Sequence, residues 1–257
     1  MNALIGDIGN TTTKICLINI KNFKIKKTIY LYSSRIISKN FLRKKLKKII
    51  NKKKIRKLGL FSSVVPKYQL MLKKFLKKVY KVNLREIKEK NINKIVKINI
   101  KNKKQIGSDR IANAISVMDK KNNFIIVDFG TATTFDVVRD DGAYIGGLIA
   151  PGVNLSLDAL YRAAARLPSI AITKPDAVVG QGTVSAMQSG IFWGYIGLIE
   201  GLVSRIKMEL DQEMTVIATG GLASLFSCGC EVIYGIDENL TIKGLQMVHE
   251  MKRESAK

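Results

Sequence analysis

Apolar and polar residues alternate along the first part of the chain with the period of β-strands. Residues 2–8 form an almost continuous apolar run, and residues 13–20 and 23–32 alternate apolar with polar side chains. This pattern predicts three antiparallel strands at the start of the chain. Gly9 and Asn10 tolerate positive φ, which suits a tight turn between the first two strands.

The pattern then changes to helical spacing. Apolar residues lie three and four positions apart over residues 39–53 and again over 67–80, which predicts two helices. The apolar run that begins at Gly59 and ends at Pro66 predicts a short strand between them, and another short strand is expected at 95–100. The first half therefore has the predicted order β-β-β-α-β-α-β.

The second half of the chain begins in the same way. The predicted strands are 124–129, 133–139, a third from Gly142 and one at 214–218, and the predicted helices are about 154–166, 184–210 and 242–252. Each half thus has three strands followed by α/β units, and 257 residues suffice for two small domains. The predicted domains are residues 1–115 and 116–257.

Two short strings, one in each half, are near copies of each other. Residues 4–14 read Leu-Ile-Gly-Asp-Ile-Gly-Asn-Thr-Thr-Thr-Lys, and residues 125–136 read Ile-Ile-Val-Asp-Phe-Gly-Thr-Ala-Thr-Thr-Phe-Asp. Each string is an apolar run followed by Asp-x-Gly and a stretch rich in hydroxyl groups. A motif repeated at half the chain length indicates a duplicated domain, with two similar lobes facing one ligand.

The first string has the chemistry of a polyphosphate site. Gly9 lets the backbone approach a ligand closely, and the N–H groups of residues 9–12 and the hydroxyls of residues 11–13 can donate to phosphate oxygens. Lys14 can add a positive charge. Asp7 can hold Mg²⁺ directly or through water, because Mg²⁺ prefers carboxylate and phosphate oxygens. A single Gly-Asn turn is most often only a hairpin, and the second copy at Asp128 favours the functional interpretation.

Two further positions have a structural and a functional interpretation. Gly107-Ser-Asp109-Arg110 begins a predicted helix, so Asp109 could simply cap the helix. Alternatively, Arg110 pairs with the carboxylate of an anionic substrate, and Asp109 accepts a proton from a hydroxyl that attacks a phosphoryl group. Thr183 either caps a long apolar helix or faces a substrate. The spacing leaves both alternatives open.

Charge is distributed unevenly along the chain. Residues 1–110 contain 32 Lys or Arg and 4 Asp or Glu, whereas residues 111–257 contain 12 and 16. A basic half can indicate nucleic-acid binding. These lysines, however, alternate with Ile and Asn without interleaved aromatic residues, and no nucleic-acid module is recognisable. A solvated lysine surface is therefore favoured, which would still attract anions such as nucleotides in a salt-dependent way.

The cysteines and the single histidine exclude some other kinds of site. Cys16, Cys228 and Cys230 are expected to be free, buried thiols in a reducing compartment, since a Cys-x-Cys pair offers too few ligands for zinc. His249 is expected at the surface, and a Ser-His-Asp triad is not expected. The chain starts directly with a strand and has neither a signal peptide nor a membrane-spanning run, so a cytoplasmic protein without membrane contact is predicted.

Taken together, nine motifs occur in the order seen in type III pantothenate kinases, which this chain resembles from residue 4 to about 245. They are Asp7-x-Gly-Asn-Thr11, Ser63-Val-Val-Pro66, Gly107-x-Asp-Arg110, Asp128-x-Gly-Thr-Ala132, Gly146-Gly-x-x-x-Pro-Gly152, Ala165-Arg-Leu-Pro168, Thr183-x-x-Ala-Met-Gln-Ser-Gly190, Thr219-Gly-Gly221 and Leu240-Thr-x-x-Gly-Leu245. Each motif is weak alone, but nine in register are specific.

The resemblance implies an α/β fold of the acetate/sugar kinase, Hsp70 and actin superfamily. This fold has two ribonuclease-H-like, actin-like lobes, each a mixed sheet with flanking helices. The implied activity is transfer of the γ-phosphate of ATP to the primary hydroxyl of pantothenate, which forms 4′-phosphopantothenate in the first step of coenzyme A synthesis. Members of the family are homodimers with the site near the subunit interface, and a nucleic-acid partner is not expected.

The resemblance also implies individual roles. Asp109 would be the general base, Asp128 a ligand of a monovalent cation (K⁺ or NH₄⁺), and Asp7 a ligand of the Mg²⁺ that accompanies ATP. The implied ATP-binding residues are Asp7, Ile8, Gly9, Asn10, Thr11, Thr12, Thr13, Lys14 and Thr131. The implied substrate-binding residues are Gly107, Ser108, Asp109, Arg110 and Thr183.

The chain departs from the family pattern in the loop before Gly107. The family usually has a Tyr and a Pro there, where this chain has Ile100 and Lys103, so one substrate contact is expected to differ.

Two alternative functions share many of these features. One is a degenerate kinase-fold protein that binds nucleic acid or a regulatory partner through its basic half, although the intact Asp7, Asp109 and Asp128 argue against decay. The other is a different phosphotransferase or phosphatase on the same fold, which would keep the Asp-x-Gly turns without needing Gly107-x-Asp-Arg110.

Overall fold

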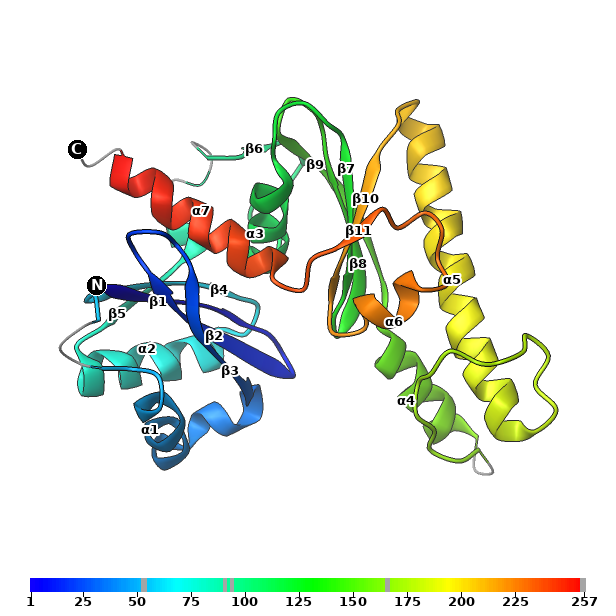
Figure 1. The fold of residues 1–257 in the computed structure, drawn as a ribbon, viewed down its shortest axis with the longest axis horizontal. Helices are drawn as coiled ribbons and strands as arrows, with labels where there is room; N and C mark the ends of the chain where they lie inside the picture. Colours follow the sequence, from blue (N-terminus) through cyan, green and yellow to red (C-terminus); the bar gives the residue numbers. More distant parts are fainter. Residues whose placement is uncertain (52–54, 90–91, 93–94, 165–166, 255–257) are drawn as a thin grey trace. The chain divides into compact units, whose positions relative to one another are not determined.

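The computed structural model describes residues 1–51, 55–89, 92, 95–164 and 167–254, and the chain divides into two compact units (Figure 1). Unit 1 comprises Met1–Val117 and Asn239–Lys257, and unit 2 comprises Met118–Glu238. The expected domains, 1–115 and 116–257, differ from this grouping because the C-terminal segment belongs with unit 1. Its helix packs on elements of the first half, which its position in the sequence does not reveal.

Unit 1 is built on a five-stranded mixed sheet with the order β3-β2-β1-β4-β5. The central strand β1 is antiparallel to β2 and parallel to β4. The strands are β1 (Asn2–Ile8), β2 (Thr12–Asn19), β3 (Ile25–Tyr32), β4 (Leu58–Ser63) and β5 (Asn83–Glu86). The edge strand β5 was not expected, because four residues are too few to establish a period.

Helices cover both faces of this sheet (Figure 1). They are α1 (Lys39–Lys47), α2 (Pro66–Tyr80), α3 (Ser108–Val117) and α7 (Leu240–Glu254). Unit 1 also contains the 3₁₀ helices Ser33–Ile37 and Ile87–Glu89, and the two-residue strand β6 (Lys97–Ile98). The apolar sides of α1 and α2 pack on Leu4, Ile8 and Ile15 of the sheet. The predicted helix over 39–53 ends earlier than expected, at Lys47, and residues 52–54 lie outside the described part of the chain.

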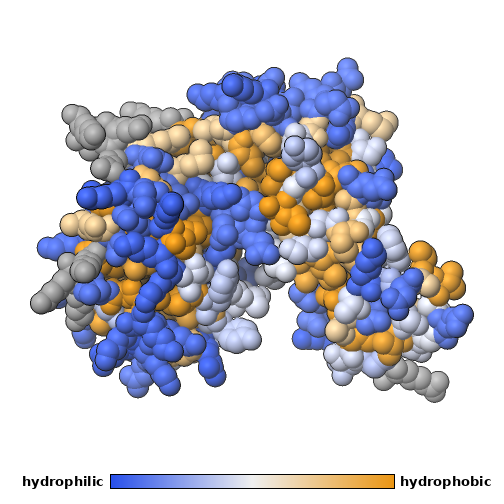
Figure 2. All heavy atoms as spheres, viewed as in Figure 1, coloured by the Kyte–Doolittle hydropathy of each residue, from blue (hydrophilic) through white to orange (hydrophobic). Residues whose placement is uncertain are grey.

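Basic side chains stand on the outer sides of α1 and α2. Figure 2 shows hydrophilic residues over much of the visible face of unit 1, and the exposed positions include Arg43, Lys44, Lys47, Lys74, Lys77 and Lys78. The buried sides of the same helices carry Leu42, Leu46, Leu72 and Leu76. The basic residues of α1 and α2 thus form the polar sides of ordinary amphipathic helices.

Unit 2 repeats the sheet of unit 1. Its strands lie in the order β9-β8-β7-β10-β11, and the central β7 is antiparallel to β8 and parallel to β10. They are β7 (Phe124–Phe129), β8 (Ala132–Val138), β9 (Ala143–Pro151), β10 (Thr215–Gly220) and β11 (Gly235–Ile236). The same strand order in both units matches the duplication inferred from the repeated string. The predicted fold class, two α/β lobes with mixed sheets and flanking helices, is confirmed.

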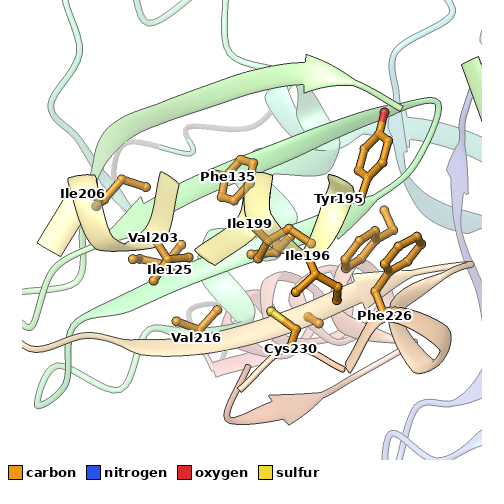
Figure 3. Packing of buried hydrophobic residues seen from close by; sticks show 14 of the residues in the cluster. Ile125, Phe135, Tyr195, Ile196, Ile199, Val203, Ile206, Val216, Phe226 and Cys230 are labelled. Atoms are coloured by element: carbon orange, nitrogen blue, oxygen red, sulfur yellow. The ribbon is translucent and has the colours of Figure 1, made fainter. Parts of the chain in front are cut away.

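The core of unit 2 forms where the long helix α5 (Thr183–Leu210) crosses the sheet (Figure 3). Its buried residues recur at helical spacing (Phe192, Tyr195, Ile196, Ile199, Val203 and Ile206) and meet sheet residues such as Ile125, Phe135 and Val216. Phe226 of α6 (Ala223–Ser227) stacks between Phe129 and Phe192, with ring centroids 5.2 and 5.4 Å away. The remaining helix, α4 (Val153–Ala163), follows β9.

Two predictions about individual side chains are wrong. His249 was expected at the surface, but it is 7% exposed, and its ring lies edge-on to Phe23 with centroids 6.3 Å apart. Cys16 and Cys230 are buried as expected, whereas Cys228 is exposed. Burial raises the pKa of Cys16, and it raises the pKa of Cys230 to about 11, so both buried thiols stay protonated at neutral pH.

In the part of the chain that the structure describes, no helix combines the length and apolar character needed to cross a membrane.

The docking of α7 depends on a close approach at Gly244. A Cβ atom added there would lie 1.8 Å from the carbonyl oxygen of Ala112 in α3. Only a glycine permits this separation between the two backbones. The close α3–α7 contact is what brings the C-terminal segment back to unit 1.

We expect Gly244→Ala to lower the free energy of unfolding by about 1–3 kcal/mol, the usual cost of overpacking. Chemical denaturation measures this change. Gly201→Ala is the matched control, because no atom lies within 4 Å of its added Cβ on the exposed side of α5. That variant should gain up to about 1 kcal/mol from helix propensity. Equal stability of the Gly244 variant and the unmodified protein would contradict the packing account.

Candidate active site

The turn between β1 and β2 forms a compact loop where these two inner strands of the first sheet meet. Ile8 pairs with Thr13 across the hairpin, and the N–H of Gly9 donates to the carbonyl of Thr12 at 3.1 Å. The side chains of Asn10, Thr11 and Thr12 are exposed. The loop therefore presents polar groups at the position where the sequence predicts phosphate contacts.

Ser33, which sequence analysis missed, supports this turn. Its N–H donates to Thr11 O (2.9 Å), its hydroxyl donates to Gly9 O (2.7 Å), and its Oγ lies 2.8 Å from Oγ1 of Thr13. Ser33 and Thr13 are fully buried. The hydroxyl of Thr13 thus stabilises the loop from inside and does not reach outward as a phosphate donor, and the side chain of Ile8 is buried as well.

Four side chains form a row across the strands beside this turn. The register pairs Ser62 with Asp7, Asp7 with Lys14, and Lys14 with Tyr30. The hydroxyl of Ser62 donates to Oδ1 of Asp7, and Lys14 Nζ lies 5.4 Å from the centroid of the Tyr30 ring. This face of the sheet therefore carries a carboxylate and an ammonium group next to the loop.

The predicted Gly107–Arg110 motif begins helix α3. Gly107 occupies the capping position, because its carbonyl accepts from the N–H of Ile111 at 3.1 Å. Asp109 is the second residue of the helix, and its Oδ1 accepts from the N–H of Arg110 at 2.8 Å. Asp109 thus satisfies one N–H of the first turn without being the cap, and its half-buried carboxylate lies at the positive end of the helix.

Ser108 anchors this loop. It is buried, and its hydroxyl donates to the carbonyl of Ser63 at the end of β4 (3.2 Å). Glu86, at the end of β5, is buried close by, and its Oε2 accepts from the N–H of Lys88 at 2.7 Å. Burial raises the pKa of Glu86, and the hydrogen bond from the N–H of Lys88 partly offsets this rise. Sequence analysis assigned no role to Glu86.

The second copy of the motif lies at the equivalent place in unit 2. Asp128 is next to last in β7, and the N–H of Gly130 donates to Ala132 O at 3.1 Å in a turn that contains Thr131. Gly220 has φ +92°, and a Cβ added there would lie 2.7 Å from Asp128 Oδ1 and 2.6 Å from the carbonyl oxygen of Phe129. A side chain at Gly220 would therefore collide with the carboxylate of Asp128 and with the carbonyl oxygen of Phe129, so this close approach requires a glycine.

Thr183 lies at a mainly apolar pocket in unit 2. It is the first residue of α5, and the capping residue is Gly182, whose N–H donates to Ser185 Oγ at 3.1 Å. The interpretation of Thr183 as a helix cap is therefore wrong. The pocket has a volume of about 580 Å³ and is lined by Leu160, Leu167, Thr183, Ala186, Met187, Gly190 and Ile191. Thr183 provides a hydroxyl group in this otherwise apolar lining.

The predicted site residues fall into two sets. Unit 1 holds the Asp7–Lys14 turn and the Gly107–Arg110 motif, and unit 2 holds Asp128, Thr131 and Thr183. Among the described residues there is no cluster of three or more His, Cys, Asp or Glu side chains suited to a metal. Residues 165–166, in the Ala165–Pro168 motif, lie outside the described part of the chain.

Comparison with known proteins identifies the family. Residues 3–205 match the family described as type III pantothenate kinase. The chain belongs to this family. It is 49% identical over 242 residues to the type III pantothenate kinase of Pelagibacter ubique, covering 94% of this chain and 96% of the relative. It is 48% identical over 192 residues to that of Paramagnetospirillum magneticum, covering 74% of each.

A solved structure extends the comparison of the fold beyond close relatives. The inorganic polyphosphate/ATP-glucomannokinase from Arthrobacter sp. strain KM superposes with a TM-score of 0.52 at 12% identity, covering 98% of this chain and 99% of that chain. At this identity the similarity concerns the fold alone. The two-lobed architecture is therefore shared with a sugar kinase, and the specific chemistry has to be argued from the family and the site.

The raised pKa of Glu86 gives the stability a predictable pH dependence. As pH rises from the unfolded-state pKa to the higher folded-state pKa, the folded protein holds a proton that the unfolded chain has lost, so the stability falls. Glu86→Gln removes this loss. We expect the variant to gain stability relative to the unmodified protein as the pH rises above about 4.3, the ordinary pKa of a glutamate, measured by denaturant unfolding over a pH series.

Glu89→Gln is the matched control, because Glu89 is an exposed residue that pairs with Lys73 at 3.1 Å. Its effect should stay within about 1 kcal/mol, as for other exposed ion pairs. A constant difference between Glu86→Gln and the unmodified protein across this pH range would show that burial does not disfavour the Glu86 carboxylate.

Proposed function

We propose that this protein transfers the γ-phosphoryl group of ATP to the primary hydroxyl of pantothenate, giving 4′-phosphopantothenate, the first step of coenzyme A biosynthesis. The observation that carries this proposal is membership of the type III pantothenate kinase family, with Asp7, Asp109 and Asp128 intact. The alternative of a nucleic-acid or regulatory binding protein is not favoured, because the relatives are pantothenate kinases.

In this proposal the first turn binds the phosphates of ATP. The backbone N–H groups of residues 10–12, the exposed hydroxyls of Thr11 and Thr12, and the ammonium of Lys14 supply donors and positive charge, whereas the N–H of Gly9 is used within the turn. Thr131 in the second turn contributes a further contact. Most of the catalysis then comes from positioning and charge stabilisation, as is usual in phosphoryl transfer.

Asp109 accepts the proton of the attacking hydroxyl, and Arg110 binds the carboxylate of pantothenate. The placement of both residues in the first turn of α3 supports these roles, since a helix N-terminus favours anionic groups. The hydrogen bond from Ser108 to the carbonyl of Ser63, at the end of β4, holds the loop that carries them. Thr183 gives the substrate a hydroxyl at the edge of an apolar pocket.

The residues present fit the two kinds of cation that the family implies. Asp7 offers a carboxylate beside the phosphate turn, which is enough for a Mg²⁺ that arrives with ATP, because Mg²⁺ is commonly held by one or two carboxylates plus phosphates. Asp128 Oδ1 and the carbonyl of Phe129 offer oxygen ligands for K⁺ or NH₄⁺ beside Gly220. Bound there, these ions would offset negative charge on the phosphates.

The protein is further proposed to form a homodimer. Several large apolar side chains of unit 2 are exposed in the single chain, including Ile149 (68%), Leu155 (53%), Leu160 (40%) and Tyr161 (49%). A group of exposed apolar residues of this kind often marks a protein interface. A second copy of the chain is the occupant that the family implies.

We expect Asp109→Asn to lower kcat for pantothenate by roughly 10²–10⁴-fold, the usual contribution of a general base. The measurement is ATP-dependent phosphorylation of pantothenate by the purified protein. Asp140→Asn changes an exposed aspartate in a turn and should leave the rate unchanged. Near-full turnover by the Asp109 variant would remove Asp109 as the base, and a lack of pantothenate phosphorylation by the unmodified protein would refute the proposed function.

We also expect turnover to be faster in K⁺ or NH₄⁺ than in Na⁺ at equal ionic strength. Asp128→Ala removes the proposed carboxylate ligand, so it should reduce the rate in K⁺ and shrink the difference between the two salts. Initial rates in matched chloride salts provide the measurement. A full K⁺ preference in the Asp128 variant would show that the cation binds elsewhere.

A further inference from the structure

The C-terminal segment contributes a polar contact to the phosphate turn of unit 1. Lys14 Nζ donates to Oδ1 of Asn239 at 2.8 Å, across 225 positions of sequence. Asn239 directly precedes α7, and its carbonyl accepts from the N–H of Lys243 at 2.8 Å. The residue thus stands at the capping position of the helix while its side chain reaches the strand that carries Lys14.

Tyr30 holds the same ammonium group from another direction. Tyr30 pairs with Lys14 across the β2–β3 ladder, and its ring lies 5.4 Å from Nζ. An aromatic face attracts a cation by its quadrupole, and the amide oxygen of Asn239 attracts it by a hydrogen bond. Both partners are uncharged, so these two contacts orient the ammonium without neutralising it.

We propose that Asn239 is a positioning residue that holds Lys14 in place to bind the phosphates of the nucleotide, with Tyr30 as a second support. The inference rests on the proposed function, because it assigns Lys14 to ATP. A lysine side chain has about 2 kcal/mol of rotamer entropy, part of which is lost when it is fixed on a ligand. Fixing the side chain before the ligand arrives reduces that loss and raises affinity.

The position of α7 determines where Asn239 lies, and the helix therefore affects the candidate site. Gly244 brings α7 against α3, and the start of the helix then places Asn239 at Lys14. Gln246 makes an independent contact from the same helix, because its Nε2 donates to Phe23 O at 2.6 Å. A variant that loses the Gln246 contact weakens the packing of the same helix and leaves the contact between Lys14 and Asn239 in place. Such a variant therefore distinguishes an effect on the position of Lys14 from an effect on the stability of the fold.

The decisive variant is Asn239→Ser. Serine is also a good helix cap, but its side chain is too short to keep the contact with Lys14. We expect the affinity for ATP, and for inorganic tripolyphosphate, to fall about tenfold, the size expected for losing one hydrogen bond to a charged group. Titration calorimetry without pantothenate measures both affinities. Gln246→Leu should leave them unchanged.

Two more variants test the mechanism. In a Lys14→Met background, Asn239→Ser should cause no further loss, since the group that it positions is gone. Asn239→Asp keeps the cap and the acceptor but adds a charge that pairs with Lys14, so it too should weaken tripolyphosphate binding. Thermal melting of every variant identifies those that fail to fold. If one of Asn239→Ser and Asn239→Asp does not fold, the other still tests the contact with Lys14.

The outcomes separate this inference from the proposed function. Unchanged ATP affinity in Asn239→Ser, or equal loss in the presence and absence of Lys14, would overturn the positioning role even if the protein phosphorylates pantothenate. Coupled losses in tripolyphosphate binding would support it even if pantothenate were not the substrate. A wild-type protein that binds neither ATP nor tripolyphosphate would overturn both.

Discussion

The architecture of the site depends on where two buried central strands end. β1 and β7 each lie between an antiparallel and a parallel neighbour, and Asp7 and Asp128 are next to last in them. Parallel strands end at the same edge of a sheet, so β4 brings Ser62 opposite Asp7, and β10 brings Thr219 opposite Asp128. Burial of the central strands thereby fixes a carboxylate beside a hydroxyl residue at the equivalent place in each unit.

The sequence predicted the elements whose periodic pattern is long. The hairpins around Gly9 and Gly130 and the helix α5 follow from clear alternation or helical spacing, because each buries one face against a core. The short strands β5 and β11 have four and two residues, and their pairing depends on neighbours that no local pattern reveals. The early end of α1 at Lys47 has a similar origin, since Ile49 and Ile50 continue the apolar pattern but are buried outside the helix.

Candidate site residues could be proposed from the sequence only where they lie within contiguous motifs. The two Asp-x-Gly turns and the Gly107–Arg110 motif were found because their residue types and spacing match a phosphate-transfer chemistry. Ser33, Ser62 and Asn239 support these motifs from distant positions. An isolated Ser or Asn has no spacing that distinguishes it from any other Ser or Asn of the chain. Thr13 shows the converse, since its place in a motif suggested a ligand contact and its burial against Ser33 indicates a structural role.

Charge in unit 1 acts in two different ways. The lysines on the outer sides of α1 and α2 are solvated, so their effect on an incoming nucleotide is a long-range attraction that salt screens. Lys14 is half-buried and held by the amide of Asn239 and the ring of Tyr30. A fixed charge in a partly desolvated place interacts with a phosphate more strongly than a mobile one in water. If Lys14 binds phosphate as proposed, the solvated lysines of α1 and α2 would not replace it.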